Sequence, residues 1–178
     1  MRTDRGTARQ LRTLLRRDPA DWRLLIEAAA RLTALRLCLA LIGPARQPRL
    51  YGRAVAPALG EAANRSIHLS AAERRTAARV GWAIARAERA LPFDVVCLPQ
   101  ALVARRMLRR RGIASVMFLG IERGKPVDEL GTHAWLVAGD VPVTGVRQAP
   151  RYKAFACYAR TAAAKRSPGA PGRQLGPL

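Results

Sequence analysis

The chain has 178 residues, of which 49% are hydrophobic and 25% charged, so it can bury a core and is not disordered over most of its length. Its 32 basic residues outnumber its 12 acidic residues, which gives a formal net charge of +20. This surplus makes nucleic acid, an acidic peptide or an anionic membrane plausible partners. Heavy use of arginine, alanine and glycine can also follow from a GC-rich genome with no selected partner, so the charge alone does not select a partner.

The cysteines and the N-terminal residues indicate a cytoplasmic protein. The cysteines are too far apart for a zinc pair or a disulfide framework, so we expect reduced thiols, no metal and no cofactor. No signal peptide is expected, because the N-terminus is charged throughout. The apolar stretch at 24–42 contains Glu27, Arg31 and Arg36, each costing roughly 2.5–3.5 kcal/mol at mid-bilayer, and therefore predicts a buried helix. The cysteines are Cys38, Cys97 and Cys157.

The N-terminal third is predicted to be helical. A basic helix is expected over about residues 5–17, and Asp18 then caps a second helix that has Pro19 at its first position. An apolar stripe with spacings of three and four follows this second helix until the segment GPARQP, 43–48, ends it. Cys38 lies beside the stripe and is expected to be a buried structural thiol. The stripe consists of Leu25, Ala28, Leu32, Leu35, Leu39 and Ile42.

Two more helices are predicted in the middle of the chain, after a less regular stretch. A capping box, SAAE at Ser70–Glu73, opens a helix that runs to about Ala90, and His68 just before it is expected at the surface. A helix over about Leu98–Arg111 follows and is closed by Gly112, with arginines crowding its C-terminal half. The inner side of the first of these helices is predicted to consist of Ala72, Thr76, Val80, Ala83, Ile84 and Ala87.

The remaining elements predict an antiparallel sheet, which makes the chain an α+β protein. The segment at 152–159 fits either a last strand or a short helix. We expect a basic helical extension over 1–69, a core over 70–161 in which a cysteine-bearing helix packs on the sheet, and a disordered tail over 162–178. The strand-like runs lie at 115–122, 133–139 and 141–145.

A cysteine and a histidine are the candidates for chemistry. Cys97 stands at the predicted start of a helix, where unpaired amides and the positive end of the helix dipole stabilise a thiolate and can hold an oxyanion. His133 opens a strand in which it shares one face with Trp135 and Val137. A thiol nucleophile needs a base close in space, and a helix packed on that face would bring Cys97 and His133 together. Each residue alone also fits a plain structural role.

A catalytic histidine also needs a third group to orient its ring. The candidate is Asp140, in the turn after the histidine's strand, although aspartate is also an ordinary turn residue. Two further acids, Asp128 and Glu129, precede that strand. Leu98 and Trp135 are expected in the oxyanion and substrate neighbourhood of the site.

Two segments, LPFDVVCLPQALVARRMLRRRGI and HAWLVAGDVPVTG, resemble the stand-alone leader peptidases of lasso-peptide biosynthesis. The C-terminal part of those proteins belongs to the transglutaminase-like, papain-related superfamily. The shared motifs are CLxxAL, LRRRGI and HAW, and the resemblance covers roughly residues 80–146. It implies a transglutaminase-like core in which Cys97 is the nucleophile and His133 its base. The basic N-terminal helices also resemble the extension of that family.

The resemblance also implies a reaction and partners. The reaction is cleavage of the leader from the core of a ribosomally made precursor peptide. The protein partners are a separate leader-recognition protein and an ATP-dependent lasso cyclase. An acidic leader or partner would give the arginine surplus a role in steering association. Nucleic acid is disfavoured, because no zinc motif or aromatic RNA-binding pattern accompanies the arginines.

The chain departs from the family at the third member of the site. Family members commonly have Asp-Gly where this chain has Gly139 and Asp140, and the acid that some relatives carry further along falls at Gly145. Either Asp140 substitutes, or a backbone carbonyl or a water holds His133. Three other interpretations stay open: a basic module that binds nucleic acid or a partner without catalysis, a non-catalytic scaffold, and amide-forming acyl transfer by the same thiol and histidine.

Overall fold

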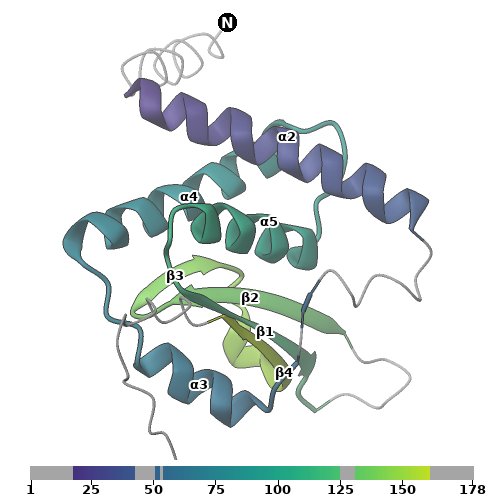
Figure 1. The fold of residues 1–178 in the computed structure, drawn as a ribbon. Helices are drawn as coiled ribbons and strands as arrows, with labels where there is room; N and C mark the ends of the chain where they lie inside the picture. Colours follow the sequence, from purple (N-terminus) through teal and green to yellow (C-terminus); the bar gives the residue numbers. More distant parts are fainter. Residues whose placement is uncertain (1–17, 43–50, 53, 125–130, 161–178) are drawn as a thin grey trace, which may run out of the picture.

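Helices precede an antiparallel sheet in the computed structural model of the chain (Figure 1). The predicted helix at 5–17 and the predicted tail at 162–178 lie outside the residues that the structure describes. Those residues are 18–42, 51–52, 54–124 and 131–160. The elements are α2 (Pro19–Leu41), α3 (Pro57–Arg65), α4 (Ala71–Ala90), α5 (Cys97–Arg110), β1 (Ser115–Glu122), β2 (Thr132–Ala138), β3 (Val141–Thr144), the 3₁₀ helix η3 (Ala149–Arg151) and β4 (Tyr152–Arg160).

The sheet has the strand order β3-β2-β1-β4, and every neighbouring pair is antiparallel. Helices α2, α4 and α5 lie on one side of the sheet and α3 lies on the other (Figure 1). The predicted α+β class, with a cysteine-bearing helix on an antiparallel sheet, is therefore confirmed. The segment at 152–159, which fitted a strand or a helix, is strand β4.

Helix α2 begins as its sequence predicts. The Asp18 carboxylate accepts a hydrogen bond of 2.9 Å from the amide of Ala20, and Pro19 takes the first helical position. Two members of the predicted stripe, Ala28 and Leu32, are buried, but the third buried side chain is Leu24. The prediction that Cys38 is a buried structural thiol is wrong, because this residue is only half-buried. Within the described residues, no helix is both long and apolar enough to cross a membrane.

A carboxylate joins α2 to the end of α5. Glu27 Oε1 lies 2.8 Å from Nε of Arg31, one turn along the same helix, and Glu27 Oε2 lies 2.6 Å from an Nη of Arg111. Burial by itself raises the pKa of Glu27, but the hydrogen bonds and charges of the two guanidinium groups outweigh it and leave this pKa below its usual value. The network therefore stabilises the ionised form of Glu27 in the folded protein.

Replacing Glu27 by glutamine is expected to lower the free energy of unfolding by about 1–2 kcal/mol near neutral pH. A group whose pKa is lower in the folded state contributes stability above its unfolded pKa and loses it as the pH falls. The gap between wild type and Glu27→Gln should therefore narrow as the pH drops below the ordinary glutamate value of 4.5. Urea unfolding at a series of pH values measures the gap. A gap that stays constant into the acid range would contradict this assignment.

Helix α4 opens with the predicted capping box. The Ser70 hydroxyl accepts a hydrogen bond from the amide of Glu73, and the Glu73 carboxylate accepts one from the amide of Ser70. The predicted inner side is partly wrong at its start, because Ala72 is exposed and Thr76 is half-buried. The buried side begins one turn later and comprises Ala77, Val80, Gly81, Ala83, Ile84 and Ala87.

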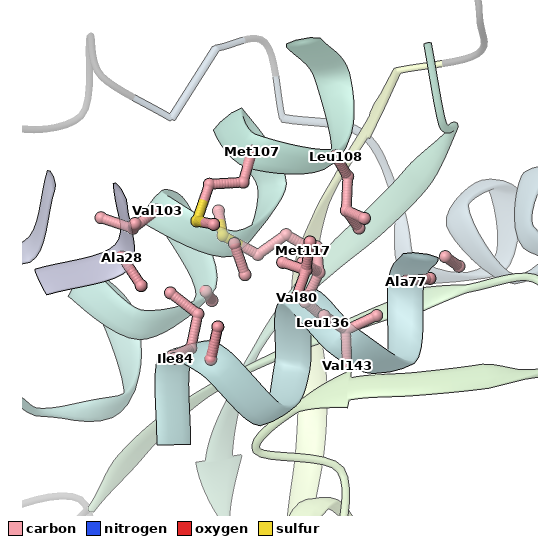
Figure 2. Packing of buried hydrophobic residues seen from close by; sticks show 14 of the residues in the cluster. Ala28, Ala77, Val80, Ile84, Val103, Met107, Leu108, Met117, Leu136 and Val143 are labelled. Carbon is pink, nitrogen blue, oxygen red and sulfur yellow. The ribbon is translucent and has the colours of Figure 1, made fainter. Parts of the chain in front are cut away.

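The main core lies between the sheet and the three helices above it (Figure 2). Val80 and Ile84 of α4 meet Met107 of α5 there, and Met117 and Leu136 contribute from β1 and β2. These side chains are buried and apolar, so their removal from water is the main stabilising term for this layer.

Helix α3 is the element that the sequence interpretation missed. It lies in the stretch predicted to be irregular and covers the opposite side of the sheet. Gly60 packs directly against Cys157 of β4, where a Cβ atom at position 60 would collide with the Cys157 sulfur. The Asn64 side chain makes two hydrogen bonds of 2.9 Å to the backbone of Gly139, in the turn between β2 and β3. Helix α3 therefore packs on the sheet through Gly60 and binds the β2–β3 turn through the Asn64 amide. It does not use an apolar stripe for this contact.

Candidate active site

Cys97 is the first residue of α5 and is half-buried. The helix begins here partly because Pro99, in the first turn, has no backbone N–H to leave unpaired. No side chain caps this helix start, whose N-cap residue is Val96. The backbone amides of the first turn, Cys97 and Leu98, therefore stay free to bind an anion.

The Cys97 sulfur lies against the strand that carries His133. Its Sγ atom accepts a hydrogen bond of 3.4 Å from the backbone N–H of Ala134, the residue directly after His133. The sulfur therefore lies at the start of α5 and within hydrogen-bond distance of the β2 backbone at the same time. The thiol of α5 thus lies beside the backbone of β2, next to the residue that is the base candidate.

His133 is the second residue of β2 and is buried, with 5% of its surface exposed. Its ring atom Nε2 lies 2.8 Å from the carbonyl oxygen of Gly145. A carbonyl oxygen only accepts hydrogen bonds, so Nε2 must carry the proton in this contact. In the neutral ring the lone pair then belongs to Nδ1, which makes Nδ1 the basic atom.

Gly145 is placed to make this contact because β3 stops early. Strand β3 ends at Thr144, which pairs with Leu136, so the first half of β2 extends beyond it. The chain turns away at Gly145 with a φ of +68°, in the left-handed region that favours glycine. A Cβ atom at Gly145 would lie 2.9 Å from Nε2 of His133 and would also crowd the carbonyl oxygen of Ala134. The backbone of Ala134 and the imidazole therefore converge on Gly145.

Two aromatic rings flank the imidazole. The Trp135 ring lies 6.0 Å from that of His133, centroid to centroid, and nearly parallel to it at 19°. The Tyr152 ring, from the first residue of β4, lies 4.8 Å away at 31°. The ring of His133 is thus held by three separate segments: its own strand, the turn at Gly145 and the start of β4.

The approach of α5 to β2 differs from the one expected. We expected the helix to pack on the face that His133 shares with Trp135 and Val137. Instead, Ala134 and Leu136 face the main core where α5 lies. Trp135 and Val137 pack against the smaller cluster of Val116, Phe118 and Cys157. The thiol reaches the backbone of β2 rather than that face.

The proposed third member, Asp140, lies elsewhere. It follows the end of β2, whereas His133 stands near the strand's beginning. Its carboxylate is 63% exposed and pairs with Arg74 of α4 at 3.2 Å. Of the alternatives for this role, the structure places the Gly145 carbonyl, and not Asp140, at the imidazole. The other acids considered, Asp128 and Glu129, lie outside the described residues.

Two residues, Leu98 and Trp135, were expected to neighbour the oxyanion and the substrate. Leu98 follows the cysteine in the first turn of α5 and is half-buried, while Trp135 contacts the imidazole. Sequence reasoning missed Tyr152, whose proximity to His133 depends on how β4 pairs with β1. Among the described residues no group of three or more histidine, cysteine, aspartate or glutamate side chains is arranged to hold a metal. A thiol, an imidazole and free helix amides together suit acyl chemistry.

Comparison with known proteins agrees with this geometry. Residues 29–160, about three quarters of the chain, match the family model described as the transglutaminase-like superfamily. No curated protein and no solved structure matches the chain. The matched range starts inside α2, contains Cys97, Ala134 and Gly145, and ends with β4. The chain belongs to the transglutaminase-like superfamily.

Proposed function

We propose that the protein is a cysteine peptidase that removes the leader from a ribosomally made lasso-peptide precursor. The observation that carries the peptidase part is the contact of the Cys97 thiol, at an uncapped helix start, with the amide next to His133. The superfamily match supports the same chemistry. The choice of substrate rests on the resemblance of the CLxxAL, LRRRGI and HAW motifs to those of leader peptidases.

The chemistry proceeds through a thioester. Nδ1 of His133 takes the proton of the Cys97 thiol, and the thiolate attacks the carbonyl carbon that joins leader to core. The negative charge on the tetrahedral oxygen is held by free amides at the start of α5, including that of Leu98. His133 then gives the proton to the leaving core amine and the peptide bond breaks. Water, deprotonated by His133, then attacks the carbonyl carbon of the thioester. The C–S bond breaks, the Cys97 sulfur regains the proton from His133, and the leader leaves as a free carboxylic acid.

The partners follow from the same proposal. A separate leader-recognition protein holds the leader, and an ATP-dependent cyclase uses the core amine that cleavage exposes. All of these act in the cytoplasm. An acidic leader or partner would be attracted by the net charge of +20, and such an attraction weakens as salt rises.

Incubation with a precursor and its leader-binding protein, followed by mass spectrometry, tests the proposal. Wild type should release a leader fragment that ends in a free carboxylate, and Cys97→Ala and His133→Ala should release none. Asp140→Ala is the matched control, because the Asp140 carboxylate is exposed and pairs with Arg74, and it should retain activity.

Each variant has a decisive outcome. Cleavage that survives Cys97→Ala would refute the cysteine mechanism. Loss of cleavage in a folded Asp140→Ala protein would return Asp140 to the site as its third member. A leader fragment whose mass includes an added amine would identify acyl transfer instead of hydrolysis.

A further inference from the structure

The imidazole of His133 has no carboxylate partner among the described residues, yet a base that becomes positively charged during catalysis needs stabilisation. Within residues 18–42, 51–52, 54–124 and 131–160, no salt bridge involves His133. Its partners there are the Gly145 carbonyl and the rings of Trp135 and Tyr152. The carbonyl orients the ring, but it carries no full negative charge.

Tyr152 is anchored independently of His133. It pairs with Glu122 across β1 and β4, and its carbonyl oxygen accepts a hydrogen bond of 3.3 Å from Nε of Arg123. The preceding residue, Arg151, pairs with the Glu122 carboxylate at 2.9 Å and its carbonyl accepts the amide of Arg123 at 3.0 Å. These contacts tie the backbone at the first residue of β4 to the end of β1, so the backbone that carries the Tyr152 ring is fixed independently of His133.

A glycine leaves room for the Trp135 ring that flanks the imidazole. Gly120 of β1 lies between β2 and β4, where it pairs with His133 on one side and Ala154 on the other. A Cβ atom at Gly120 would lie 2.8 Å from the ring of Trp135. The pairing of β1 with β4 is irregular at this point, between Leu119 and Gly120. The ring of Trp135, from β2, therefore lies close to the backbone of β1 at a residue without a side chain.

The face of an aromatic ring attracts a positive charge, because its π electrons give it a negative quadrupole. In its neutral form, the imidazole gains only ordinary contact energy from Tyr152. Once Nδ1 takes the thiol proton, the ring is a cation 4.8 Å from the Tyr152 centroid, within the range of a cation–π interaction. The contact therefore favours the charged state of the histidine over the neutral state.

We infer that Tyr152 is a positioning residue for His133, and that its ring supplies the stabilisation of the imidazolium that a carboxylate supplies in a complete triad. The inference rests on the proposed function, because it concerns the same thiol and imidazole. It makes the charged pair of Cys97 and His133 depend on a residue that neither donates nor accepts a proton in the reaction.

The reactivity of the Cys97 thiol with iodoacetamide tests this without any substrate. The alkylation rate of Cys97 is read by peptide mass spectrometry from about pH 6, where only a thiolate paired with an imidazolium reacts, to about pH 9, where ordinary thiols also react. The half-buried Cys38 serves as an internal reference for reagent and pH. The fully buried Cys157 reports unfolding, because it becomes alkylated only when the sheet opens.

The Tyr152→Leu variant removes the π face and should lower the Cys97 rate near pH 6 by about five- to thirty-fold, with little change near pH 9. Tyr152→Phe retains the ring and should react as wild type at both ends. Phe155→Leu, an exposed aromatic on the same strand, is the matched control and should change nothing. A structural effect alone would alter the rate across the whole pH range.

A wild-type rate at low pH in folded Tyr152→Leu would overturn the inference. If that variant exposes Cys157, Tyr152→Gln, which also lacks a π face, takes its place with the same criteria. His133→Ala separates the two proposals. Loss of low-pH reactivity in His133→Ala but not in Tyr152→Leu overturns the role of Tyr152 alone. Retention in His133→Ala shows that no charged pair forms and overturns both.

Discussion

Replacing Gly145 by alanine is expected to lower the rate of leader removal by about a hundredfold, because displacements near 1 Å at a reacting group have effects of this size. The added Cβ would lie 2.9 Å from Nε2 and 3.2 Å from Cε1 of His133, and it would crowd the carbonyl oxygen of Ala134. Either the imidazole or the turn must move. In both cases the hydrogen bond that places the proton on Nε2 is lost or bent. Single-turnover cleavage of the precursor, read by mass spectrometry, measures the effect.

Gly112 offers a matched control for the backbone component of that change. Its φ of +71° is close to the +68° of Gly145, but a Cβ at Gly112 would meet nothing within 4 Å. Gly112→Ala should therefore lose about 1 kcal/mol of stability through backbone strain and retain full activity. Equal activity of the two variants would show that the contact with His133 is not what glycine at 145 preserves.

The helix boundaries could be read from the sequence where a signal lies within a few residues. The Asp18 cap with Pro19, and the capping box of Ser70 and Glu73, are local devices whose partners are two or three residues away. Gly112 likewise ends α5, where its amide bonds to the carbonyl of Arg109 at 3.1 Å. Such contacts need no knowledge of the rest of the fold.

Helix α3 could not be read in this way. Its nine residues, PALGEAANR, contain one large apolar side chain, Leu59, and that side chain is exposed. The helix is stabilised instead by the close approach of Gly60 to Cys157 and by the bonds of Asn64 to Gly139. These partners are about 75 to 100 residues away in the chain, so the periodicity of the local sequence does not predict helix α3.

The candidate site shows the same division. The sequence singles out Cys97 by its place at a helix start, and His133 by its strand and by the resemblance of the HAW motif to that of leader peptidases. The group that orients the imidazole depends instead on the geometry of the β2–β3 hairpin. Asp140 is only seven residues from His133, yet a strand rises about 3.3 Å per residue, which puts the two about 20 Å apart along β2. Gly145 is further in sequence, but the chain has turned back by then and its carbonyl meets the ring.

The division at residue 69 between an extension and a core stays a prediction. Leu32 of α2 is fully buried in the same cluster as α4 and α5, and the family match starts at residue 29. The first observation concerns how α2 packs, and the second concerns where the match to the family begins. Neither tests whether the core folds without the residues that precede it.

Replacing Gly81 by alanine is expected to destabilise the protein by about 1–3 kcal/mol, although alanine is the better helix former by about 1 kcal/mol. Gly81 lies in the middle of α4, where the helix backbone approaches the carbonyl oxygen of Val143 in β3 so closely that a Cβ atom would collide with it. Since the obstacle is backbone, the helix or the strand must shift as a whole. Val143 is two residues before Gly145, so the shift should also lower the cleavage rate of the folded protein.

Urea unfolding and the single-turnover cleavage rate together measure this effect. The matched control is Ala78→Gly, an exposed position on the same helix, which should lose about 1 kcal/mol by helix propensity alone and leave the cleavage rate unchanged. One substitution replaces glycine by alanine and the other alanine by glycine, yet both should destabilise the protein. Helix propensity determines the effect at position 78, and the close contact with β3 determines it at position 81. A Gly81→Ala protein that is more stable than wild type would mean that α4 does not rest on β3, and the placement of Gly145 beside His133 would lose its support.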